Sequence, residues 1–125
     1  MKLETITANG QTVAVLTGAV PAVTDVQSAL DVMMAAKYEA GSQLLAIEKT
    51  VLPEEFFILS TGLAGEILQK FTNYGVKCAI YGDFSGYTSK PLRDFIRESN
   101  RGSGVFFAAD RAEAVERLTG GTARA

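Results

Sequence analysis

Polar and apolar residues alternate in two segments near the start of the chain. Residues 3–8 and 12–18 alternate with a period of two and are rich in β-branched side chains, which is typical of half-buried strands. Asn9-Gly10 lies between them, and this pair favours a tight turn because both of its residues accept a positive φ. The pattern therefore predicts a β-hairpin.

Three later segments are short and largely apolar, and four others show helical spacing. Short apolar runs predict strands, and the run of residues 44–47 is expected to be an interior parallel strand covered on both faces. Apolar residues at i, i+3 and i+4 predict amphipathic helices. The expected strands are residues 44–47, 76–82 and 104–109. The expected helices are residues 25–41, 61–75, 90–100 and 111–118.

Polar residues at the ends of these segments predict where the helices begin and stop. Thr24 or Asp25 is expected to cap the first helix, and Thr88 or Ser89 the third. Residues 100–102, Asn-Arg-Gly, are expected to end the third helix in a left-handed conformation.

The order of the expected elements predicts the fold class. A hairpin followed by alternating helices and strands indicates an α/β fold with a mixed β-sheet, in which the hairpin leads into βαβαβα units with right-handed crossovers. A single domain is expected over residues 1–118, and residues 119–125 are expected to form a flexible tail.

Composition narrows the range of functions. The chain has 125 residues, 47% of them apolar, and a net charge of −2 without a long basic run, so nucleic-acid binding is not expected. No apolar run approaches the ~18 residues of a membrane span, and the first residues form no signal segment. We therefore expect a cytoplasmic protein that does not bind a membrane.

Histidine is absent and cysteine occurs once. The absence of histidine excludes Ser–His and Cys–His triads and most transition-metal sites, so neither a metal nor a cofactor is expected. Cys78 lies inside an expected strand, and we interpret it as a small buried hydrophobe rather than a nucleophile. Any acid–base chemistry would depend on carboxylates, lysine or tyrosine.

Polar residues follow the carboxyl ends of the expected parallel strands, where open α/β sheets bind their ligands. Glu48 follows one strand and Asp83-Phe84-Ser85 the next, while Ser60-Thr61-Gly62 opens the helix between them. The N-terminus of a helix attracts anions through its free N–H groups and its dipole. The candidate binding residues are Glu48, Ser60, Thr61, Gly62, Asp83, Phe84, Ser85, Ser89, Lys90 and Arg93.

Several of these residues also have a purely structural interpretation. A hydroxyl at Ser60 or Thr61 is more often an N-cap than a ligand. Asp83 is typical of an Asx-turn, and Lys90 has the i, i+4 spacing of an ion pair with Asp94. No aromatic cluster is expected near these loops, which counts against a small-molecule site.

The stretch from Leu59 to Leu63, Leu-Ser-Thr-Gly-Leu, resembles a motif of the STAS domains of anti-sigma-factor antagonists and sulphate-transporter tails. In those antagonists a strand-to-helix junction carries Asp-Ser-Ser/Thr-Gly and a hydrophobic residue, and a partner kinase phosphorylates a hydroxyl there. Ser60 matches the phosphorylated serine and Gly62 the glycine, with Leu59 in place of the aspartate. The order of elements also resembles the STAS fold. The resemblance implies a STAS-like regulatory module with Ser60 as a possible phosphorylation site.

A second resemblance covers most residues from Asp25 to Leu118. It is carried by the segments TGLAGEILQKF, YGDFSGYTSKPLRDFIRESNRG and VFFA, which are similar to an uncharacterised family of small bacterial domains of unknown function. This resemblance implies a stand-alone bacterial cytoplasmic domain, and no activity comes with it.

Three classes of function remain open. The first is a regulatory module without enzymatic activity, which contacts a partner protein through the edge around Ser60 and Asp83. The second is a domain that binds a nucleotide or another small anion at the same edge. The third is an enzyme in which Glu48 and Asp83 act as acid and base. A homodimer is compatible with each, through an edge strand such as residues 12–18 or through an exposed helix face.

Overall fold

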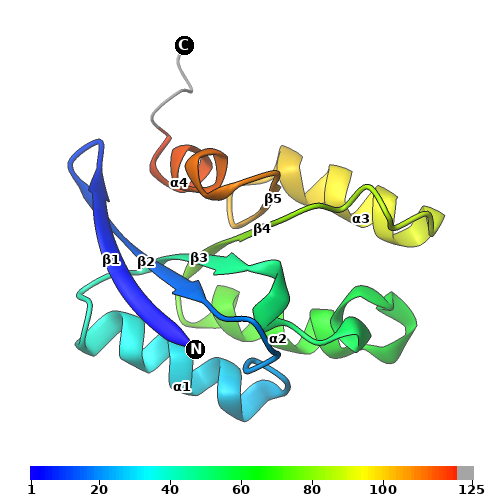
Figure 1. The fold of residues 1–125 in the computed structure, drawn as a ribbon, viewed down its shortest axis with the longest axis horizontal. Helices are drawn as coiled ribbons and strands as arrows, with labels where there is room; N and C mark the ends of the chain where they lie inside the picture. The colour runs from blue at the N-terminus through cyan, green and yellow to red at the C-terminus, as the bar shows by residue number, and fades with distance from the viewer. Residues whose placement is uncertain (121–125) are drawn as a thin grey trace.

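The computed structural model describes residues 1–120 and contains a five-stranded sheet with helices on both faces (Figure 1). The strands are β1 (Lys2–Ala8), β2 (Gln11–Thr17), β3 (Leu44–Glu48), β4 (Lys77–Tyr81) and β5 (Val105–Ala108). The α-helices are α1 (Val26–Tyr38), α2 (Leu63–Asn73), α3 (Lys90–Arg101) and α4 (Arg111–Thr119). The short 3-10 helices η1 (Lys49–Val51), η2 (Glu54–Phe57) and η3 (Leu59–Thr61) connect β3 to α2. The predicted α/β fold is confirmed.

The strands lie in the sheet in their sequence order, from β1 to β5. β1 and β2 form an antiparallel hairpin around Asn9-Gly10, whose φ angles are 53° and 74°, and all other neighbouring strands are parallel. The predicted hairpin and the parallel centre of the sheet are therefore confirmed. The prediction that residues 12–18 form an edge strand is wrong, because the hairpin places β1 outside β2 and leaves β1 and β5 as the two edges.

Two hydrophobic cores cover the two faces of the sheet. The three crossovers run in one direction, and right-handed crossovers of this kind place their helices on the same face. The core on that face contains Leu16, Leu45, Ile47, Cys78, Ile80 and Phe107 from the strands and Met33, Ile67 and Leu92 from the helices. The opposite core lies beneath α4 and contains Val13, Val15, Ala46, Ala79, Tyr81, Ala114, Val115 and Leu118 (Figure 1). Burial of Cys78 raises the pKa of its thiol, in agreement with its interpretation as a hydrophobe.

Two of the predicted helix starts are confirmed. Asp25 and Ser28 form a capping box at the start of α1, in which each side chain hydrogen-bonds to the backbone N–H of the other. The Ser89 hydroxyl accepts a hydrogen bond from the backbone N–H of Leu92 in the first turn of α3. These caps satisfy N–H groups that a helix cannot satisfy internally.

The end of α3 differs from the prediction. The helix continues through Arg101, and Gly102 has a φ of −88°, so the left-handed stop expected at residues 100–102 is wrong. Asn100 instead uses its side chain across the fold: it accepts a hydrogen bond from the N–H of Phe107 at 2.7 Å and donates one to the Phe107 carbonyl at 3.1 Å. This pair of bonds fixes the end of α3 to β5.

The chain ends beyond α4. Residues 121–125, which make up most of the predicted tail, lie outside the described residues. Within residues 1–120, no helix combines the length and the apolar character that a membrane crossing requires.

Candidate functional site

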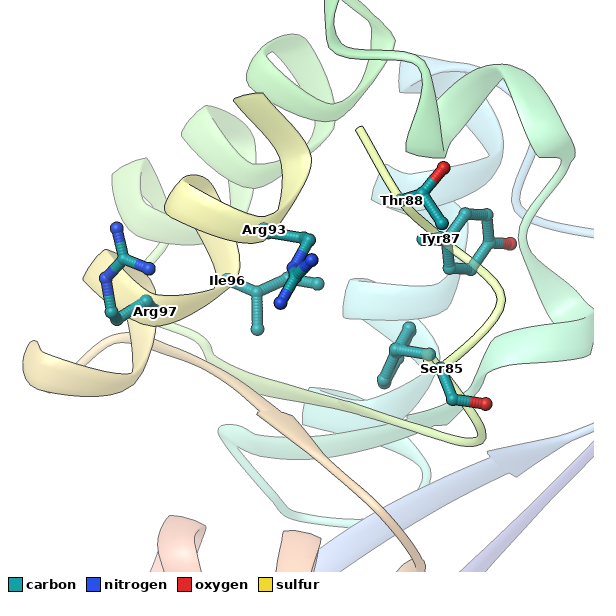
Figure 2. A pocket seen from close by; sticks show the side chains of 7 residues that line it. Ser85, Tyr87, Thr88, Arg93, Ile96 and Arg97 are labelled. Atoms are coloured by element: carbon teal, nitrogen blue, oxygen red, sulfur yellow. The ribbon is translucent and has the colours of Figure 1, made fainter. Parts of the chain in front are cut away.

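Two hollows lie side by side at the carboxyl end of the sheet. The first, of about 450 Å³, lies between the η2–η3 segment and the loop before α3, and its lining includes Phe57, Ile58, Ser60, Tyr87, Thr88 and Ser89. The second, also of about 450 Å³, lies between that loop and α3 and is lined by Phe84, Ser85, Tyr87, Thr88, Arg93, Ile96 and Arg97 (Figure 2). Tyr87 and Thr88 belong to both, and we refer to the two hollows together as the Tyr87 surface.

The hollows are built by loops rather than by a crevice in the sheet. Open α/β sheets bind ligands where the strand order reverses and adjacent crossovers diverge to opposite faces. Here the order runs from β1 to β5 without a reversal. The site is formed instead by residues 82–89 and by the η2–η3 segment, which both lie on the face covered by α2 and α3.

An aromatic cluster forms the base of the Tyr87 surface. The rings of Phe57 and Tyr87 are stacked with their centroids 5.1 Å apart, and Phe84 packs edge-on against Phe107 at 5.5 Å. The Lys49 ammonium lies 4.5 Å from the centre of the Tyr87 ring, within the range of a cation–π interaction. The expectation that no aromatic cluster lies near these loops is therefore wrong.

Tyr87 is partly buried and keeps its proton at neutral pH. Burial, together with a 3.1 Å hydrogen bond from its hydroxyl to Glu54, raises the pKa of Tyr87 to about 12. Its hydroxyl is thus committed as a donor to Glu54, and its ring is held by Phe57 and Lys49, so Tyr87 forms a fixed wall between the two hollows. The bond also ties the 82–89 loop to η2.

The Ser-Thr-Gly stretch divides into a structural threonine and a free serine. The Thr61 hydroxyl lies 2.8 Å from the Glu55 carbonyl and 2.9 Å from the Ile58 carbonyl, and it accepts a weak bond from Leu63 N–H at 3.3 Å. Gly62 occupies the N-cap position of α2 with a φ of 81°, so no cap side chain is available there. Ser60 is exposed in the first hollow, and within the described residues its hydroxyl forms no hydrogen bond.

Asp83 forms the predicted Asx-turn. Its carboxylate accepts a hydrogen bond from the Ser85 backbone N–H at 2.9 Å, and hydrogen bonds from the hydroxyl and the N–H of Ser85 lower the pKa of Asp83. The Asp83 carbonyl accepts a 2.9 Å bond from the Lys49 ammonium. Asp83 therefore shapes the loop and stays ionised, while Phe84 and Ser85 line the second hollow.

Glu48 points away from the Tyr87 surface. β3 and β4 pair Glu48 with Tyr81, whose side chain lies in the core beneath α4, whereas Phe84 and Tyr87 pack on the opposite core. The Glu48 carboxylate accepts a 3.1 Å hydrogen bond from the Gly18 N–H and so holds the loop after β2. Glu48 and Asp83, the two carboxylates considered as acid and base, thus hold two different loops, the one after β2 and the one after β4. No cluster of three or more potential metal ligands occurs within residues 1–120.

Three basic residues at the start of α3 have different surroundings. Lys90 forms the predicted ion pair with Asp94 at 2.6 Å, and Asp94 also pairs with Arg97, so the pKa of this carboxyl is lowered first by Lys90 and then by Arg97. Arg93 forms no ion pair with a carboxylate of the described residues. Figure 2 shows its guanidinium extending from α3 into the space that faces Ser85 and Thr88.

The structure thus brings together part of the predicted site. Of the candidate residues, Ser60, Phe84, Ser85, Ser89 and Arg93 line the Tyr87 surface. Thr61, Gly62 and Asp83 support its loops, and Glu48 and Lys90 are not among its lining residues. Sequence reasoning missed Ile58, Tyr87, Thr88 and Arg97. Ile58 lies within the apolar run of residues 56–59, so no local pattern marks it as exposed, and the aromatic residues meet only through the fold.

Comparison with known proteins gives a family and no activity. No curated protein and no solved structure matches the chain. The resemblance to STAS domains is not confirmed by these comparisons. Residues 8–118 match the model of a family described as Domain of unknown function (DUF4180), which includes every residue of the Tyr87 surface. The prediction of an uncharacterised domain family is confirmed: the chain belongs to the DUF4180 family of domains of unknown function.

Proposed function

We propose that this domain is a regulatory binding module without enzymatic activity, and that it contacts a partner protein through the Tyr87 surface. The observation that carries the proposal is Ile58, an apolar side chain that is 53% exposed at the side of a hollow with an aromatic base. Protein interfaces combine an apolar centre with a polar rim and are enriched in aromatic residues and arginine. Around Ile58 the rim consists of hydroxyl groups, and Arg93 and Arg97 follow along α3.

Ser60 gives this surface a possible means of control. Its hydroxyl forms no hydrogen bond within residues 1–120, and Ser60 lies three residues before α2, whose first turn has no cap side chain. A phosphate there would add about −1.5 to −2 charges beside free N–H groups, which favour an anion, and it would repel an acidic partner. The resemblance of this junction to the STAS motif supports the same role. A Ser60→Ala variant that keeps every partner contact and response would contradict this control.

Site-specific photo-crosslinking in cells that make the protein tests the proposal. We expect a photoreactive residue at Ile58 to give a discrete adduct with a partner protein, and we expect Arg93→Glu to weaken that adduct. Tyr38 is the control position, because it is 80% exposed on α1 and lies outside both hollows. Adducts that are identical at positions 58 and 38, or the absence of any adduct at 58, would contradict a partner-binding role.

A second candidate function is the binding of a small anion, such as a nucleotide or inorganic phosphate. The observation that favours it is Arg93, whose guanidinium extends into the second hollow and forms no ion pair with a carboxylate of residues 1–120; Ser85 and Thr88 line the same hollow. Arginine and hydroxyl groups are suited to phosphate oxygens because both donate hydrogen bonds.

Thermal unfolding with inorganic phosphate or a nucleoside monophosphate separates the two candidates. A ligand at about 100 times its Kd adds about 2.7 kcal/mol of stability, which raises Tm by several degrees. We expect any such rise to be lost in Arg93→Gln and kept in Arg101→Gln, a control on the same helix whose side chain pairs with Glu98. If neither probe raises Tm, the anion candidate fails and the partner-protein proposal stands alone.

A further inference from the structure

The two edges of the sheet differ in whether their outer backbone groups are hydrogen-bonded. At the β5 edge, the Asn100 side chain binds both the N–H and the carbonyl of Phe107, so these groups are closed to another strand. At the β1 edge, no strand or side chain of the described residues hydrogen-bonds to the outer backbone groups. An open edge of seven residues is a template for strand pairing unless something covers it.

The hairpin register identifies which backbone groups point outward. Ala8 and Gln11 flank the two-residue turn and form a hydrogen-bonded pair. From this pair onward, hydrogen-bonded and non-hydrogen-bonded pairs alternate along the hairpin. Every second residue of β1 therefore bonds to β2 through its backbone groups, namely Ala8, Ile6, Glu4 and Lys2. The groups of Leu3, Thr5 and Thr7 face the open edge.

We propose that two copies of this chain associate through antiparallel pairing of their β1 strands, with Leu3 of one copy opposite Leu3 of the other. In this register Lys2 of each copy lies opposite Glu4 of the second copy, at positions that are not hydrogen-bonded and where side chains approach most closely. A shift by two residues would place Glu4 opposite Glu4, and a shift by four would place it opposite Ile6. The charges of β1 therefore favour one self-complementary register.

An apolar hollow beside β1 is covered by the same arrangement. It has a volume of about 360 Å³ and lies between β1 and α1. Its apolar lining residues are Met1, Leu3, Leu16, Ala22, Val32 and Ala35, and Ser28, Asp31 and Glu39 complete the lining. Leu3 packs on this face of the sheet, and Met1 is 68% exposed beside it. Leu3 of the second copy would lie on the same face and would remove this apolar surface from water.

Sedimentation across a concentration range, with charge-swapped variants, tests the pairing. We expect the wild-type protein to form a dimer, and we expect Lys2→Glu and Glu4→Lys each to raise the dissociation constant about tenfold, because each variant places like charges opposite one another. The double variant Lys2→Glu with Glu4→Lys should restore the wild-type constant. Glu4 also pairs within its own chain with Lys2 at 3.6 Å and with Arg111 at 3.4 Å. Arg111→Ala is the control for loss of an ion pair of Glu4 within one copy, and it should leave association unchanged.

Cysteine cross-linking tests the register independently. Hydrogen-bonded residues in an antiparallel pair have Cα atoms about 5.5 Å apart, which a disulfide can span. Leu3→Cys should therefore oxidise to a covalent dimer, while Thr5→Cys should not, and the native Cys78 is buried. A wild-type monomer at high concentration, a double variant that fails to recover, efficient cross-linking through Thr5→Cys, or pairing of β1 with a strand of another protein instead of a second copy would overturn the proposal.

Discussion

Replacement of Gly82 by alanine is expected to destabilise the domain by about 3 kcal/mol and to lower Tm by on the order of 10 °C. Gly82 has a φ of 156°, a conformation that residues with a side chain rarely adopt. A Cβ atom at this position would lie 2.8 Å from the Lys49 Cβ, which is attached to the backbone and cannot swing aside. Gly82 therefore allows β4 and the segment after β3 to approach each other.

The same substitution is expected to disturb the Tyr87 surface. Displacement of Lys49 would break its bond to the Asp83 carbonyl and remove its ammonium from the Tyr87 ring. Gly86→Ala is the matched control, because Gly86 lies in the same loop, and an added Cβ meets no atom within 4 Å. Thermal unfolding of both variants measures the difference. Equal Tm values for Gly82→Ala and Gly86→Ala would show that the close approach of Lys49 does not constrain the loop.

Asn100→Ala is expected to cost about 2–4 kcal/mol of unfolding free energy. Asn100 satisfies both backbone groups of Phe107, a residue that is only 3% exposed, and its removal leaves a donor and an acceptor without partners. The variant should also loosen α3, which carries Arg93 and Arg97, and it should open the β5 edge to other strands.

Urea unfolding and amide hydrogen exchange measure this effect. We expect a lower midpoint for Asn100→Ala and faster exchange of the Phe107 amide, whereas Asn73→Ala should change the unfolding free energy by less than about 0.5 kcal/mol. Asn73 is a suitable control because its side chain accepts a single hydrogen bond from Gln69 on the exposed face of α2. An unchanged Phe107 exchange rate in Asn100→Ala would rule out the proposed attachment of α3 to β5.

Sequence patterns predicted the elements because their signals are local. The Asn-Gly turn predicted the hairpin and the short apolar runs predicted β3, β4 and β5, since both signals depend on residues that are neighbours in the chain. The sequence of residues 100–102 predicted a helix stop, but the Asn100 side chain hydrogen-bonds to the backbone of Phe107 in β5 instead. The role of this residue thus depended on a strand that begins five residues later.

The functional surface was predictable only in part, because its chemistry depends on which strands become neighbours. Hydroxyls at Ser60 and Ser89 were visible as helix-start residues, but Phe57, Tyr87 and Phe107 meet only once β3, β4 and β5 lie side by side. Glu48 was predicted to belong to the surface and does not line it. Glu48 lies at the predicted end of β3, but side chains alternate between the two faces of the sheet, and Glu48 points to the face covered by α4. The sequence alone did not show which residues of β3 point to which face.

We propose that the Tyr87 surface is where this domain meets its partner. The measurement that tests it most directly is the dissociation constant of the cross-linked partner for Ile58→Asp and for Tyr38→Asp, with matched Tm values. A charge placed in the apolar centre of an interface costs about 2 kcal/mol or more, so we predict binding about 30-fold weaker or worse for Ile58→Asp. Tyr38→Asp should bind like the wild type. Equal dissociation constants for the two variants would show that the partner does not bind at the Tyr87 surface.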